Sequence, residues 1–235
     1  MQGELAEDMQ KKQAISQMFR LAKQEKAYYT SCMKWNDRFS QMFTEAVYRY
    51  HEQPQPIAAD HFFLPEEKEL LASIGYTPHE MFDYVEDYAT LGEPSPSTVL
   101  LIAAARRAFF LKEQRGTTGG ASPLREIDLP RETDEYQDIA YLPRIIRKAH
   151  AKLHGILPPR VMYYCPKDRA FMKNHGDIHP ADFLYEVWDA RGDWQKVVAR
   201  VLRMIKENSA AQASRAEAPA AGAPAEAPKS PAPSA

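Results

Sequence analysis

The sequence contains only two cysteines among its 235 residues, Cys32 and Cys165. Two cysteines in such different sequence contexts do not make the disulfide framework of a small secreted domain, so a reducing compartment is the simpler inference. The N-terminal segment carries Glu4, Glu7 and Asp8 and lacks the basic start and apolar core of a signal peptide. We therefore predict a cytoplasmic protein.

Long apolar runs are also missing. The longest, from Val99 to Ala105, meets Arg106 and Arg107 well before the roughly 20 residues that a membrane-spanning helix needs. A phosphate-binding loop is missing too, because Gly119 and Gly120 are followed by no Gly-Lys-Ser/Thr and preceded by no strong strand. We expect a soluble protein without a membrane span, and we predict no cofactor.

Proline and glycine are absent from residues 4 to 50, a stretch rich in helix-favouring residues. A largely apolar stripe runs along it at seven-residue spacing, through Ile15, Ala22, Tyr29, Asn36, Phe43 and Tyr50. Pro54 and Pro56 end the stretch, so we interpret residues 1–53 as a helical arm. We expect residues 4 to 50 to self-associate or to bind a protein partner. Packing of the stripe against its own domain is the alternative.

Segments that begin at proline and end at glycine follow one another from Pro65 onward, with apolar residues at helical spacing. Thr77-Pro78-His79-Glu80, for example, has the threonine cap, the proline and the glutamate of a helix start. The pattern predicts an all-α fold with about seven or eight helices, in which residues 54–207 form a compact helical domain. We expect the helix after Ser95 to be the central buried one. At most a token strand is expected, at Val161–Tyr164.

Two regions are expected to lack fixed structure. From Asn208 onward the sequence is almost entirely Ala, Pro, Ser and Glu, which is too poor in large apolar side chains to fold. We predict that residues 208–235 are a disordered Ala/Pro-rich tail. Residues 116–140 form the longest connection inside the domain, and we interpret their glycine-rich start as a mobile linker.

Positive charge is concentrated in residues 141–173, which contain eight Lys or Arg and one acid, Asp168. The rest of the chain holds 22 basic and 31 acidic residues. One face of the helix predicted before Gly155 carries the cations Arg144, Arg147, Lys148 and Lys152. A solvated basic face is the simple interpretation, and a face that binds an anionic ligand is the alternative. We expect Asp168 to pair with Arg144 or Lys148.

Cys165 lies beside Lys167 and Arg169, cations of the kind that activate thiols, so an enzyme with Cys165 as nucleophile is a further alternative. Asp168 could orient the base, for which there are four candidates, His150, His154, His175 and His179. Because Cys165 follows an apolar run, a buried structural cysteine competes with this interpretation. A zinc site of Cys165, His175 and His179 would lack a fourth ligand. We assign no catalytic residue and no metal.

Three segments together resemble a bacterial family known only as a domain of unknown function. They are Leu142-Pro143-Arg144-Ile145-Ile146-x-Lys148-Ala149, Cys165-Pro166-x-Asp168-x-x-Phe171 and the helix start at Ile178–Phe183. The resemblance covers roughly residues 60 to 206. It implies no reaction and no cofactor. It implies only a shared signature, which comprises Leu142, Pro143, Arg144, Lys148, Cys165, Asp168 and Phe171.

Three functions of different classes stay open. We expect a non-catalytic interaction or accessory protein. The alternatives are binding of nucleic acid or another polyanion through residues 141–173, and an enzyme that uses Cys165 or a His–Asp pair. The placement of four side chains should discriminate between them: Arg144, Lys148, Cys165 and Asp168. Convergence in an open pocket favours chemistry, spread over a convex surface favours anion binding, and burial favours a scaffold.

Overall fold

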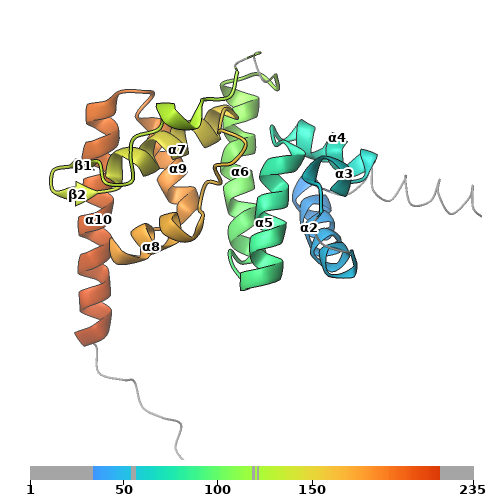
Figure 1. The fold of residues 1–235 in the computed structure, drawn as a ribbon. Helices are drawn as coiled ribbons and strands as arrows, with labels where there is room; N and C mark the ends of the chain where they lie inside the picture. Colours follow the sequence, from blue (N-terminus) through green and yellow to red (C-terminus); the bar gives the residue numbers. More distant parts are fainter. Residues whose placement is uncertain (1–33, 54–56, 118–119, 121, 218–235) are drawn as a thin grey trace, which may run out of the picture.

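The computed structural model describes residues 34–53, 57–117, 120 and 122–217, which form nine α-helices, one 3-10 helix and one two-stranded sheet (Figure 1). The predicted all-α fold is confirmed. The elements are α2 (Trp35–Glu52), α3 (Ala59–Phe62), α4 (Pro65–Ser73), α5 (Pro78–Leu91), α6 (Pro96–Lys112), η1 (Glu126–Asp128), β1 (Glu135–Tyr136), β2 (Ile139–Ala140), α7 (Leu142–His154), α8 (Pro166–Asn174), α9 (Pro180–Asp189) and α10 (Trp194–Glu217).

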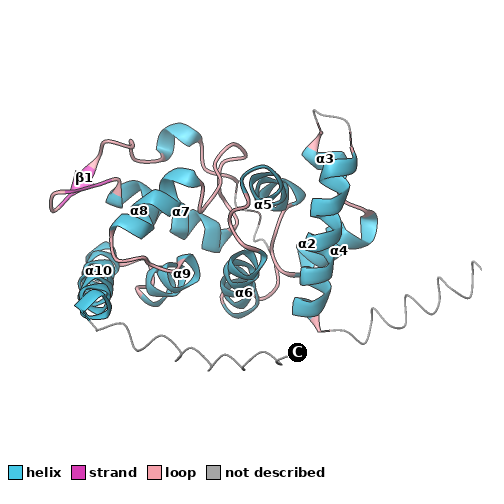
Figure 2. Cartoon of the chain, turned by 90° about the horizontal axis from the view of Figure 1, so that it is seen from below, coloured by secondary structure: helices cyan, strands magenta, loops and turns pink. Residues whose placement is uncertain are grey.

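α6 is the central helix, as predicted. It buries Val99, Ile102, Ala103 and Phe109 and packs against α7 and α9 on one side and α2 on the other. α2 also contacts α5, and α10 packs on α9 at the opposite end of the molecule from α2 (Figures 1 and 2). The core therefore runs through α6 and connects both ends of the row of helices.

α2 belongs to this core and is not an external arm. Its side chains Phe39, Phe43 and Tyr50 are buried, and the rings of Phe43 and Tyr50 contact α5, with 6.0 Å between the ring centroids of Tyr50 and Phe82. The prediction that residues 4 to 50 stay outside the core is therefore wrong for Trp35–Tyr50. The apolar stripe there is covered by the protein's own helices. Residues 4–33 lie outside the described part of the chain.

The structure differs from the sequence-based predictions in three places: the end of α10, the segment Val161–Tyr164 and the position of the strands. α10 continues to Glu217, so the predicted end of the domain at residue 207 is too early, because the Ala-rich sequence that follows still favours helix. Residues 218–235 of the predicted tail are not described. Val161–Tyr164 forms turns and not a strand. The strand pair lies in the 116–140 connection, where Glu135 pairs with Ala140.

The start of α5 has the predicted capping box. The Thr77 hydroxyl accepts a hydrogen bond from the backbone N–H of Glu80 at 3.2 Å, and the Glu80 carboxylate accepts one from the backbone N–H of Thr77 at 3.0 Å. This arrangement fixes the Glu80 side chain at the first turn of α5. Among the described helices, none is long and apolar enough to cross a membrane.

Candidate functional site

Lys148 and Lys152 lie one turn apart on α7, and both are buried in the protein. Only 2% of the Lys148 side chain and 1% of the Lys152 side chain is exposed. The prediction of one solvated basic face made of Arg144, Arg147, Lys148 and Lys152 is therefore wrong. The physical reason is that each lysine has a carboxylate partner from another helix, while Arg144 and Arg147 are only half-buried.

Asp168 is the partner of Lys148, as the sequence predicted. The Lys148 Nζ lies 2.5 Å from the Asp168 Oδ2, and the carboxylate is fully buried. It also accepts hydrogen bonds from the Tyr141 hydroxyl and from the backbone N–H groups of Tyr164 and Cys165. Tyr141 and Tyr164 have φ values of 71° and 66°, a left-handed conformation that costs about 1–2 kcal/mol per residue. Their bonds to Asp168 hold them in it.

Lys152 is accommodated differently. Its Nζ lies 3.1 Å from the Glu80 Oε1, and 15% of the Glu80 side chain is exposed. The same ammonium lies 3.8 Å from the ring centroid of Tyr76 and 5.2 Å from that of Tyr84, so aromatic faces replace part of its hydration. Burial lowers the pKa of Lys152, and the charge of Glu80 opposes that shift.

A third buried cation, Arg106, lies close to Lys152. Its Nη1 donates to the Gln114 side chain at 2.7 Å, and its Nε and Nη2 are buried without a hydrogen-bond partner among the described residues. The guanidinium fits against Gly75 and Gly155, where an added Cβ would lie 2.8 Å and 2.5 Å from its Nη2. Burial lowers the pKa of Arg106. Of these two buried cations, only Lys152 forms an ion pair with a described carboxylate, that of Glu80.

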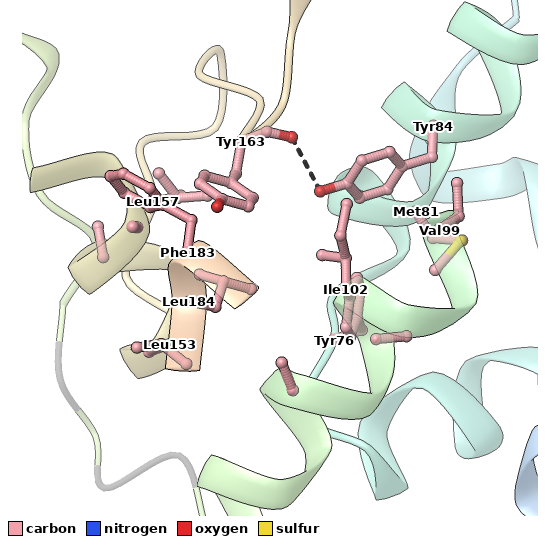
Figure 3. Close-up of a cluster of buried hydrophobic side chains, with 14 of the residues drawn as sticks. Tyr76, Met81, Tyr84, Val99, Ile102, Leu153, Leu157, Tyr163, Phe183 and Leu184 are labelled. Carbon is pink, nitrogen blue, oxygen red and sulfur yellow. Dashed lines mark hydrogen bonds between the residues drawn. The ribbon is translucent and has the colours of Figure 1, made fainter. Parts of the chain in front are cut away.

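The loop between α7 and α8 is attached to the core by tyrosines. The Tyr84 hydroxyl donates to the backbone oxygen of Tyr163 at 2.9 Å, as the dashed line in Figure 3 shows. The Tyr163 ring lies beside Leu157 and Phe183 in the same view, and its hydroxyl donates to the oxygen of Pro180 at 2.8 Å. These contacts fix the backbone just before Cys165.

Beside this loop the surface forms a cleft of about 480 Å³, which we call the α5–α7 cleft. It is bounded by α5, by residues from the 126–132 segment, by the start of α7 and by residues 159–166. Arg144, Lys148 and Cys165 all line it, and Asp168 lies behind Lys148. Three of the four discriminating side chains thus lie at one pocket, the outcome expected of a binding or catalytic site, whereas the burial of Lys148 and Asp168 is the outcome expected of a scaffold.

Two arginines of the α5–α7 cleft have no ion-pair partner within the described ranges. Arg160 is exposed, and Arg144 donates only to the backbone oxygen of Pro130, at 2.6 Å. Two of the acids at the cleft are already paired, Asp87 with Arg169 and Glu132 with Lys167. The cleft therefore offers two arginines that form no ion pair with a described residue, although five carboxylates also line it: Asp83, Glu86, Asp87, Glu126 and Glu132.

Asp83 on α5 lines the same cleft, and its carboxyl forms no hydrogen bond or ion pair with the residues that the structure describes. Burial raises its pKa from 3.8 to about 6, with His79 and Lys152 acting in the opposite direction. A second cavity of about 510 Å³, with a more apolar lining, also includes His79 and Asp83. Asp83 is therefore a carboxyl that can exchange a proton near neutral pH at the boundary of two cavities.

Sequence reasoning missed His79 and Asp83. We interpreted Thr77–Glu80 only as a helix cap, although a His and an Asp four residues apart share one helix face. Two of the four histidines considered instead serve local structure: the His175 ring is bonded to the backbone oxygen of Phe171, and His179 accepts from Ala181 at the start of α9.

Cys165 is half-buried, and its Sγ lies 3.4 Å from the Lys148 Nζ. None of the four histidines first considered as its base lines the α5–α7 cleft. Within the described residues, no three His, Cys, Asp or Glu side chains are arranged to hold a metal ion, so Cys165, His175 and His179 do not come together as a zinc site.

No protein-family model matches this chain, and comparisons with curated proteins and with solved structures also find no match. The resemblance to a bacterial domain of unknown function therefore stays a prediction.

Proposed function

We propose that the protein is a ligand-binding domain whose α5–α7 cleft takes a small molecule carrying a carboxylate or phosphate group. The observation that supports this most directly is that the same cleft contains two arginines, Arg144 and Arg160, that form no ion pair with a residue in the described part of the chain. A guanidinium binds planar anions through parallel N–H bonds, which gives orientation as well as affinity.

Asp83 adds a second property to the proposed site. A carboxyl with a pKa near 6 can accept a proton from a bound ligand or donate one to it at physiological pH. His79 lies one turn before Asp83 on α5. The enzyme alternative with a His–Asp pair can therefore use His79 and Asp83, and not the histidines of α7 and α8. An acid–base step on the bound ligand is therefore the reaction class that this cleft supports.

The test is a binding measurement by calorimetry with three probes: inorganic phosphate, succinate and AMP. We expect at least one of them to bind and the Arg144→Gln and Arg160→Gln variants each to bind it about tenfold more weakly. Lys206→Gln is the matched control, since Lys206 is an exposed cation outside the cleft. Equal weakening in all three variants, or no binding of any probe at millimolar concentration, would contradict the proposal.

Association with a protein partner or a second copy, through residues 4–33, is the second candidate. The apolar stripe of these residues continues the one that α2 buries, and burial of each large apolar side chain stabilises by about 1.5–3 kcal/mol. Deletion of residues 1–33 should leave the melting temperature of the domain unchanged while sedimentation shows a smaller species. Deletion of residues 1–52 should unfold the domain, since it removes Phe39 and Phe43. If the particles contain the same number of chains before and after the shorter deletion, association through residues 4–33 is rejected.

A further inference from the structure

A separate cavity of about 380 Å³ lies where α6, α7 and the end of α9 meet, and none of its lining residues belongs to the α5–α7 cleft. Its walls include Phe109 from α6, His150 and His154 from α7 and Trp188 from α9. The volume is within the range of small-molecule sites, which begins near about 300 Å³.

Four planar rings line this cavity, together with Leu153, Val187, Gly192 and the charged residues Glu113 and Arg191. The ring centroids of Phe109 and Trp188 lie 5.4 Å apart in an edge-to-face arrangement, and those of Phe109 and His154 lie 4.7 Å apart. The indole N–H of Trp188 donates to the Glu113 carboxylate at 3.0 Å, which fixes the orientation of the indole. Rings held in this way form flat contact surfaces for a flat ligand.

The two histidines are stacked, with 4.0 Å between their ring centroids. Burial lowers the pKa of His150 to about 4 and also lowers the pKa of His154. The His154 Nδ1 lies 2.8 Å from the backbone oxygen of His150, which can only accept, so the proton is on Nδ1 and the Nε2 is a hydrogen-bond acceptor.

The His150 ring has the opposite tautomer. Its Nδ1 is buried and has no hydrogen-bond partner in the described part of the chain. A buried N–H without an acceptor is rarer and more costly than a buried lone pair without a donor, so the proton belongs on Nε2. The two stacked rings, both of which line the cavity, therefore carry one donor, the His150 Nε2–H, and one acceptor, the His154 Nε2.

We propose that this cavity binds a planar heterocycle with a lactam edge, in which a ring carbonyl and a ring N–H are neighbours. The carbonyl accepts from His150, the N–H donates to His154, and the ring faces contact Phe109 and Trp188. Oxopurines and uracil-type pyrimidines have this combination of flat shape and paired donor and acceptor. The site shares no lining residue with the α5–α7 cleft, so each of the two proposals is tested independently of the other.

The test compares hypoxanthine, which has the lactam edge, with purine, which has the same ring system without it. Binding to the full chain is followed by NMR through the indole N–H signal of Trp188, assigned with a Trp188→Phe variant. We expect hypoxanthine to shift this signal saturably, to leave the Trp35 signal unchanged, and to bind about tenfold more tightly than purine. The His154→Phe variant keeps a planar ring without the acceptor and should remove this preference.

A second ligand makes the test independent of any variant. In 1-methylhypoxanthine the lactam N–H is replaced by a methyl group, so its affinity for the wild-type protein should fall to that of purine or below. Equal affinity for hypoxanthine, its methylated form and purine would overturn the proposal by showing an apolar pocket without lactam recognition. No shift of the Trp188 signal up to the solubility limit of hypoxanthine would overturn it as well.

Discussion

Lys148 and Lys152 lie on the same helix, one turn apart, and the protein accommodates their charges in two different ways. Lys148 faces a fully buried carboxylate whose oxygens also accept from the Tyr141 hydroxyl and two backbone N–H groups. Lys152 pairs with the partly exposed Glu80 and lies against two tyrosine rings, while the buried Arg106 nearby forms no ion pair with a described residue. The first region balances charge with charge, and the second has more buried cations than acids.

This difference predicts which substitutions lower the stability of the folded protein in each region. A buried ion pair in which every polar atom is satisfied is destabilised mainly when one partner is removed, because the other charge is then left without compensation. A buried cation whose pKa is already lowered by desolvation contributes less to stability, so its removal is tolerated better. The Lys148 region should therefore respond strongly to substitution and the Lys152 region weakly.

The largest expected effect is that of Asp168→Ala. It leaves Lys148 buried without a counter-charge and removes the acceptor that holds the turn before α8, so the free energy of unfolding should fall by roughly 3–5 kcal/mol. Glu80→Ala is the matched substitution in the other region and should cost about 2 kcal/mol, since Lys152 keeps its two ring faces. Urea denaturation measures both. Equal losses would show that the two regions do not differ.

Removing the cations gives the second test. Lys148→Met leaves the ionised Asp168 fully buried, and we expect the free energy of unfolding to fall by about 3 kcal/mol. Lys152→Met places an apolar side chain against Tyr76 and Tyr84 and leaves Glu80 partly hydrated, so stability should change by no more than about 1 kcal/mol. A larger loss for Lys152→Met than for Lys148→Met would reverse the comparison.

The sequence could predict part of this arrangement. The all-α class, the central α6 and the Lys148–Asp168 pair followed from proline-initiated helices and from a single acid in a basic segment. The Lys152–Glu80 pair could not be predicted, because Glu80 is 72 positions away and already had a role as a capping residue. A helical pattern identifies which residues share a face, but it does not reveal whether another helix covers that face.

Sequence patterns do not show which elements pack together, and this also explains why the core position of α2 and the α5–α7 cleft were not predicted. The apolar stripe of residues 35–50 has the same spacing whether its partner is another chain or α5 and α6, so periodicity alone cannot separate an arm from a core helix. The α5–α7 cleft brings together His79, Asp83, Arg144 and Cys165 from distant parts of the sequence. Only the fold places them together.

The last expected effect depends on pH and concerns Asp83, which lies within the electrostatic reach of Lys152. Its folded-state pKa of about 6 lies above 3.8, so its ionisation destabilises the folded state, and stability present below pH 4 is lost as the pH rises through about 6. Asp83→Asn should therefore stabilise the protein at pH 7.5 by about 1–3 kcal/mol and have little effect at pH 4. A gain of equal size at both pH values would contradict the raised pKa.

For the proposed ligand site in the α5–α7 cleft, the hydrogen bonds around Tyr163 and Asp168 have a consequence for the rate of binding. The backbone from Tyr163 to Cys165 is held by the Tyr84 hydroxyl on one side and by the Asp168 carboxylate on the other, so this wall is formed before any ligand arrives. A preformed wall loses little conformational freedom on binding. In stopped-flow measurements the observed association rate should accordingly rise in proportion to ligand concentration, without a slower closing phase.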